Sequence, residues 1–170
     1  MASMTFMFAS GLGVAAMIRV GNQKGFQDYV KLRVVALSII LMTILLYTFF
    51  VFFFVIFHSY IPLFFLDAED AKNALLNREV IDMAGKLLMI AAIFQISDGI
   101  QVTVLGALRG LQDVNIPTVI TFVSYWLIGF PVAIYLGLYT NLGAEGIWYG
   151  LLAGLTAAAI FSYLRLNYMT

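Results

Sequence analysis

The chain has 170 residues, of which 63% are hydrophobic and 11% are charged, and its mean hydropathy is +0.99. Soluble domains contain about 45–50% apolar and about 25% charged residues, so this composition is typical of a protein surrounded by lipid. Nine basic residues balance nine acidic ones, which gives no sign of a nucleic-acid partner, and the lack of cysteine excludes disulfides, thiolate metal sites and a cysteine nucleophile.

Long uncharged stretches dominate the chain. Residues 1–18, 34–57, 114–144 and 146–164 carry no charge, and Asp98 is the single charge within 87–108. A helix needs about 20 apolar residues to cross about 30 Å of hydrocarbon. We therefore predict an all-α, polytopic transmembrane helix bundle. Its five crossings are expected at roughly 3–18, 34–57, 87–108, 116–139 and 146–164.

The basic residues indicate how these crossings are oriented. Lysine and arginine accumulate in loops on the cytoplasmic side of a membrane. The first connection, the third connection and the C-terminal tail carry six of them: Arg19, Lys24, Lys31, Arg33, Arg109 and Arg165. The second and fourth connections carry only Lys72, Arg78 and Lys86, outnumbered by acidic residues. This bias predicts a cytoplasmic C-terminus. Segment 67–86, in the second connection, is expected to form a short surface helix that continues into the third crossing.

The third crossing contains the strongest functional signal. Gln95, Asp98 and Gln101 are spaced three apart, which places them within an arc of about 120° on a helix. A carboxylate at mid-membrane costs at least about 2.5–3.5 kcal/mol, so it normally faces a cavity or a partner. One interpretation is a proton or cation site whose oxygens suit a hard ion. The other is a buried interhelical hydrogen bond that fixes packing.

The fourth crossing contains a proline in its middle. Pro131 removes one backbone hydrogen bond and predicts a kink, which is either a hinge for transport or a static bend that improves packing. Aromatic residues near the ends of the last two crossings are expected to form an interfacial belt. They are Tyr125, Trp126, Tyr139, Trp148 and Tyr149.

The chain contains none of the common enzyme motifs. We find no phosphate-binding glycine loop, no HExxH motif and no GxSxG motif with a plausible triad, because His58 is the only histidine. We therefore expect a protein that is not an enzyme and has no cofactor. No metal site is expected other than sodium at Asp98.

Four groups of motifs follow one another along the chain. They are Ile18–Asn22 with Gly25, Phe94–Gly99 with Ala107–Gly110 and Asp113, Tyr125–Pro131, and Gly143–Gly150. Together they resemble one known family, the bacterial multidrug and toxin extrusion (MATE) transporters. They resemble, in order, the end of the family's eighth helix, the tenth helix with its following loop, the eleventh helix and the entry to the twelfth. The chain departs from the family at Phe130, where leucine is common, and at Gln112, where glycine often follows Arg-Gly.

The resemblance implies a twelve-helix, two-lobe antiporter that exports organic cations and drugs in exchange for sodium or protons. Residues 1–170 would form part of its C-terminal lobe, embedded in the bacterial inner membrane. In the family, an aspartate on the tenth helix contributes to a cation site, and the matching residue here is Asp98. The expected partners are the lipid bilayer, the missing N-terminal lobe with the remaining helices, and small organic cations.

Two alternatives remain open at this stage. One is a lipid-linked oligosaccharide flippase of the same superfamily, which a basic central cavity in the missing lobe would favour. The other is a non-transporting membrane subunit in which Asp98 docks a partner helix. We expect the chain, as either a fragment or a partial sequence, not to transport by itself, because the seventh helix and its acidic residue are absent.

Overall fold

The computed structural model describes residues 2–57 and 74–170, and within 2–4 and 74–84 it describes only the helical course, apart from the side chain of Met83. The described residues form helices joined by short connections: α1 (Ala2–Gly25), α2 (Tyr29–Phe57), α3 (Ala74–Gly110), α4 (Asn115–Val123), the π-helix η2 (Ser124–Gly129), α5 (Phe130–Leu138) and α6 (Ala144–Met169). The all-α fold is therefore as predicted. The start of the surface helix, expected near Asp67, lies outside the described residues.

Four of the helical stretches are long and apolar enough to cross a membrane. They are Tyr29–Phe57, Gly85–Gly110, Asn115–Leu138 and Ala144–Met169. The described part of α1 is not among them, so the predicted crossing at 3–18 coincides with a helix but stays a prediction as a membrane span. Large apolar side chains are exposed along these stretches, for example Leu45, Phe52 and Leu127 at 63–68% exposure. Such a surface suits a multi-pass membrane protein, because lipid covers it without cost.

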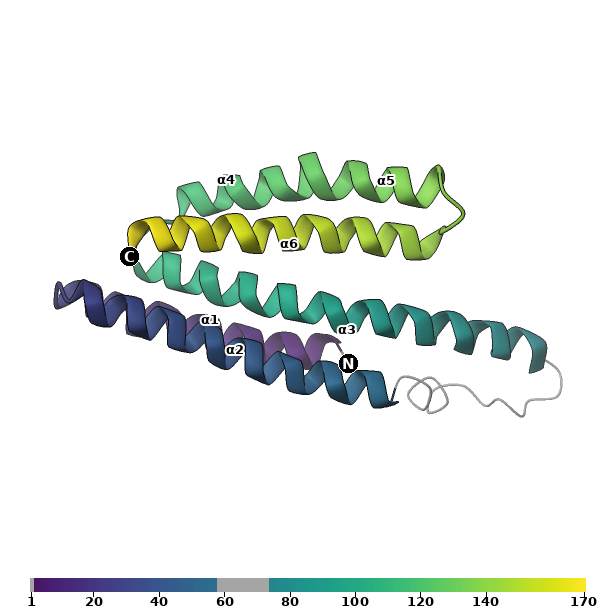
Figure 1. Cartoon of the computed structure of the whole chain (residues 1–170), viewed down its shortest axis with the longest axis horizontal. Coiled ribbons are helices and arrows are strands. Elements are labelled where there is room, and N and C mark those ends of the chain that lie inside the picture. The colour runs from purple at the N-terminus through teal and green to yellow at the C-terminus, as the bar shows by residue number, and fades with distance from the viewer. Residues whose placement is uncertain (1, 58–73) are drawn as a thin grey trace.

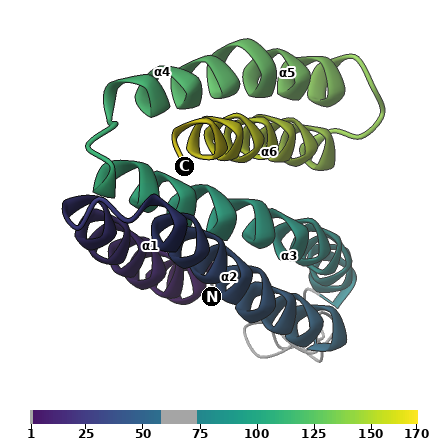
Figure 2. The same cartoon turned by 60° about the vertical axis from the view of Figure 1, so that its left-hand side comes forward.

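Helix α3 lies in the middle of the bundle (Figures 1 and 2). Helices α1 and α2 pack on one side of it, and α6 packs on the other, beneath the continuous stretch from α4 to α5. A cluster of buried apolar residues joins α1, α2, α3 and the end of α6, with Leu32, Leu108 and Leu166 almost completely enclosed. Helix α3, which carries the polar stripe, is therefore in contact with α1, α2 and α6.

Small residues allow the helices to approach closely. A Cβ added at Gly106 would collide with the backbone of Gly13 on α1, and one added at Gly150 would collide with Ala133 on α5. Gly154 of α6 packs in the same way against Gly129 of η2. Backbone contact of this kind is typical of helix association in lipid, where oil–water partition does not drive helices together.

Helices α1 and α3 end in the same kind of turn. Gln27 and Gln112 have φ angles of 58° and 60°, in the left-handed region. After α1, the Gln27 N–H donates to the Lys24 carbonyl at 3.0 Å and the Asp28 N–H donates to the Gln23 carbonyl at 3.2 Å. This pattern is a Schellman cap, in which glycine is the usual left-handed residue. A glycine would adopt the left-handed conformation at Gln27 or Gln112 with less strain than the glutamine that is present.

Asp28 begins α2 immediately after the first of these turns. Its Oδ1 accepts a hydrogen bond from the Lys31 N–H at 3.0 Å, and its Oδ2 lies 2.9 Å from Lys31 Nζ. The hydrogen bond from the Lys31 side chain, helped by the one from its backbone, lowers the pKa of Asp28. The carboxylate therefore stays ionised at the positive end of α2, as expected for an N-cap.

Polar contacts tie the helices together at the end of the bundle where the C-terminus lies (Figure 1). Lys24 Nζ donates to the Leu111 carbonyl at 2.7 Å, which joins the end of α1 to the end of α3. Arg33 of α2 donates to Asn167 of α6 at 3.0 Å. The basic connections of the sequence thus gather at one end of the bundle, and the α5–α6 connection lies at the other.

Candidate functional site

The predicted polar stripe lies on α3, the central helix. Gln95 and Gln101 are 7% and 5% exposed, and Asp98 between them is half-buried. Ser97 points away from the stripe, because its hydroxyl lies 3.1 Å from that of Thr156 on α6. The helical spacing has therefore brought one carboxylate and two amides to a shared face inside the bundle.

The Asp98 carboxylate has no hydrogen-bond or ion-pair partner in the part of the chain that the structure describes. Within 5–57 and 85–170 it makes no hydrogen bond and no ion pair. It does interact electrostatically with two phenols, those of Tyr47 on α2 and Tyr125 on η2. The packing interpretation of the sequence, a hydrogen bond from Asp98 to a neighbouring helix, thus finds no partner among these residues.

Tyr47 forms one wall of the site. It is completely buried, and its hydroxyl donates to the Thr5 carbonyl of α1 at 2.6 Å. Its ring packs against α3 at Gly99, where an added Cβ would come within 2.7 Å of the ring. The glycine next to Asp98 therefore lets a tyrosine approach the carboxylate.

The two glutamines differ in their hydrogen bonding. Gln101 Oε1 accepts a hydrogen bond from the Tyr125 hydroxyl at 3.1 Å. Gln95 Oε1 is buried and has no hydrogen-bond partner among the residues that the structure describes. An unpaired buried amide oxygen costs about 1–3 kcal/mol, so it is a candidate ligand for a cation or an ordered water.

A cation at this site would be bound by few charged groups. Among the described residues, no group of three or more His, Cys, Asp or Glu side chains could hold a metal ion. The available oxygens are those of the Asp98 carboxylate and of the neighbouring amides. This donor set has a single negative charge, which suits a monovalent hard cation or a proton better than a divalent metal.

Sequence reasoning did not assign the two tyrosines to the site. Tyr125 was expected in an interfacial belt, which stays a prediction, and the hydrogen bond from its hydroxyl to Gln101 is a contact that this interpretation did not include. Tyr47 is the only tyrosine in the uncharged stretch 34–57. A phenol far from the ends of such a stretch needs a polar partner inside the protein, and that signal was available.

Pro131 lies at the second position of α5, directly after the π-helix η2. The Phe130 N–H donates to the Tyr125 carbonyl, five residues earlier, which is the spacing of a π-helix. Proline has no N–H and its ring clashes with the carbonyl four residues earlier in an α-helix, so a wider turn directly before Pro131 suits it better. The predicted irregularity is present as a π-helical segment, whereas its role as a hinge stays a prediction.

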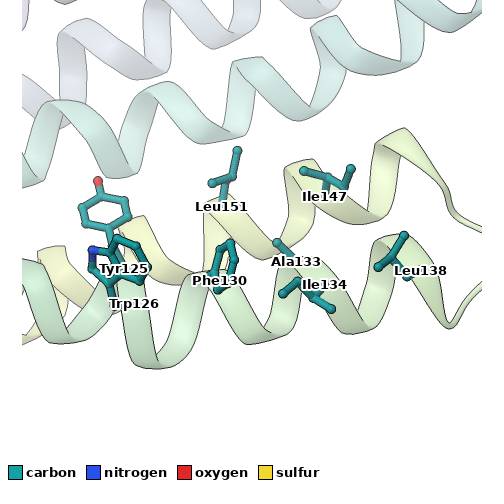
Figure 3. A pocket seen from close by; sticks show the side chains of 8 residues that line it. All are labelled: Tyr125, Trp126, Phe130, Ala133, Ile134, Leu138, Ile147 and Leu151. Carbon is teal, nitrogen blue, oxygen red and sulfur yellow. The ribbon is translucent and has the colours of Figure 1, made fainter.

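An apolar groove runs beside this segment (Figure 3). It has a volume of about 500 Å³ and lies between η2, α5 and α6. The Trp126, Phe130 and Leu151 side chains line it, together with the ring of Tyr125. In Figure 3 the Tyr125 hydroxyl points out of the groove and towards α3.

Comparison with known proteins identifies the family. The family model described as MatE matches residues 1–135. The chain belongs to the MatE family. The fold agrees with this family. A solved structure titled as the inward-facing conformation of a multidrug resistance MATE family transporter superposes with a TM-score of 0.82, at 19% sequence identity. The superposition covers 99% of this chain and 37% of that one. The eukaryotic MATE transporter AtDTX14 superposes with a TM-score of 0.79, at 21% identity over 98% of this chain and 35% of its own.

Several curated relatives are bacterial. The chain is 35% identical over 171 residues to the multidrug resistance protein NorM of Photobacterium profundum, covering 98% of this chain and 36% of the relative. It is 36% identical over 170 residues to NorM of Burkholderia vietnamiensis, covering 99% and 36%. The MatE chain thus spans about a third of the length of the curated relatives that it matches.

Proposed function

We propose that this chain forms part of a secondary-active antiporter that exports organic cations and drugs in exchange for sodium or protons, and that Asp98, Gln95 and Gln101 form its coupling site. The observation that carries the proposal is the Asp98 carboxylate, half-buried in the central helix without a hydrogen bond or ion pair among the described residues. The family relationship supports the same function, because relatives from several bacteria are named multidrug resistance proteins.

The physical basis of coupling is the cost of an uncompensated charge in lipid. An empty, ionised Asp98 raises the energy of any state in which the site is closed to water. Binding a proton or a sodium ion neutralises the carboxylate and removes that cost. An antiporter needs a site of this kind, because the bound ion must change which conformation is favoured and must then be released.

Alternating access also needs a second structural unit. In transporters of this type, two repeats move against each other around a site near the membrane midplane. The chain spans about a third of its relatives, and we propose that it supplies the coupling site while the rest of the transporter supplies the opposing lobe. The basic end of the bundle, with Lys24 and Arg165, faces the cytoplasm in this proposal.

A chimera tests the proposal. Residues 1–170 replace the matched segment of Photobacterium profundum NorM, and the 170-residue chain is expressed alone beside it. In proteoliposomes, with sodium and pH gradients varied separately, the chimera should export a fluorescent organic cation and the chain alone should not. A chimera that reaches the membrane without gradient-dependent export would contradict the proposal, and so would gradient-dependent export by the chain alone.

A further inference from the structure

Tyr125 connects the polar stripe on α3 to the opposite layer of helices. It belongs to η2, and its hydroxyl donates to Gln101 Oε1 at 3.1 Å. Gln101 is 5% exposed and Tyr125 is partly buried, so the protein shields much of the bond from competing water. The ring of Tyr125 meanwhile lines the apolar groove between η2, α5 and α6 (Figure 3).

The backbone of the same residue takes part in the irregular turn before Pro131. The Phe130 N–H donates to the Tyr125 carbonyl, which closes a turn of the π-helix. Single π-helical turns are rare and often occur at functional sites. Tyr125 therefore hydrogen-bonds to Gln101 through its side chain and forms part of the π-helix before Pro131 through its main chain.

We propose that Tyr125 is a positioning residue that couples ion binding at Asp98 to the geometry of η2, the π-helical segment directly before Pro131. This inference rests on the proposed function of Asp98 as the coupling site. The amide oxygen of Gln101 has two lone pairs, so it accepts from Tyr125 and binds a cation at the same time. A movement of this amide towards the ion displaces the phenol, and η2 moves with it.

The first test is the ion dependence of export by the chimera. Tyr125→Phe removes the hydroxyl and keeps the ring that lines the groove. It should raise the sodium or proton concentration for half-maximal export about three- to tenfold, as expected for one lost hydrogen bond. The KM for the organic cation should change less than about twofold, because the groove side of the ring is unchanged. Tyr135→Phe, on the exposed face of α5, is the matched control and should change neither value.

The second test follows the geometry of η2 directly. Spin labels on cysteines at Thr118 and Leu138 lie on either side of η2, in α4 and α5. Adding the coupling ion should change the distance between the labels in the unmodified chimera and in Tyr135→Phe. It should leave the distance unchanged in Tyr125→Phe and in Gln101→Leu, which removes the same hydrogen bond from its other side.

The two proposals fail in different ways. If Tyr125→Phe keeps both the ion dependence and the ion-induced distance change of the unmodified chimera, the role of Tyr125 is refuted and that of Asp98 is untouched. If Asp98→Asn keeps ion-dependent export, Asp98 is not the coupling residue, and the proposed role of Tyr125 is refuted as well.

Discussion

Arg165 Nε lies 2.8 Å from Asp113 Oδ2, and this ion pair holds the last helix against the connection between α3 and α4. The two side chains are 24% and 10% exposed. Asp113 lies immediately after the left-handed Gln112, whose turn also receives Lys24 from α1. Two basic side chains from different helices therefore fix the same connection.

Removing Arg165 should destabilise the bundle. Arg165→Gln leaves a partly buried Asp113 carboxylate without its cation, and the free energy of unfolding should fall by about 1–3 kcal/mol. The measurement is unfolding of the chain in mixed detergent micelles. The control is Arg19→Gln, an exposed arginine on α1. Equal losses from both variants would show that the ion pair contributes nothing.

The close contact between α1 and α3 can be tested with alanine. Gly106→Ala places a methyl group against the Gly13 backbone, and overpacking of this kind should cost about 1–3 kcal/mol. Gly11→Ala, on α1, meets nothing within 4 Å and should be neutral or slightly stabilising. If the two variants unfold at the same detergent composition, α1 and α3 do not pack as described.

The left-handed turn after α1 predicts changes of opposite sign at neighbouring glutamines. Gln27→Gly removes the strain of a side chain at φ 58° and should stabilise the chain by about 1 kcal/mol. Gln23→Gly places glycine in the last turns of α1 and should destabilise it by about 1 kcal/mol. The same unfolding assay measures both, and a loss of stability from Gln27→Gly would exclude the Schellman cap.

The orientation of the bundle can be tested by labelling, because the chain has no cysteine. Cysteines at Gln27 and Gln112 should react with a membrane-impermeant reagent only when it reaches the cytoplasmic side. A cysteine at Asn141, in the α5–α6 connection, should react only from the other side. Labelling of Gln27 and Asn141 from the same side would overturn the arrangement, and reversal of all three would overturn the orientation.

The sequence was informative where the signal is local. Uncharged stretches located the helices, because a helix satisfies its backbone groups within the same stretch of chain and so can cross lipid alone. The helix ends were less accurate: α1 continues through Lys24 to Gly25, and α2 starts at Tyr29 before Lys31 and Arg33. The hydropathy of the sequence falls at these charged residues, whereas the helices themselves include them.

The candidate site could be predicted only in part. Helical spacing placed Gln95, Asp98 and Gln101 on one face, and the structure keeps them together on α3. The surrounding tyrosines come from α2 and η2, and no local pattern states which helix packs against Asp98. The π-helix was also missed, since Pro131 indicates an irregularity but does not specify how the neighbouring turn adapts.

The most direct test of the account is Asp98→Asn in the chimera with NorM of Photobacterium profundum. Asparagine is isosteric and removes a charge that is expensive in lipid, so membrane abundance should be equal or higher. Export driven by a sodium or a pH gradient should be abolished, while Gln95→Ala and Gln101→Ala should weaken ion affinity without ending turnover. A docking role for Asp98 makes the opposite forecast, because the asparagine can still hydrogen-bond. Unchanged export by Asp98→Asn, at equal protein level and under both gradients, would remove Asp98 from the mechanism.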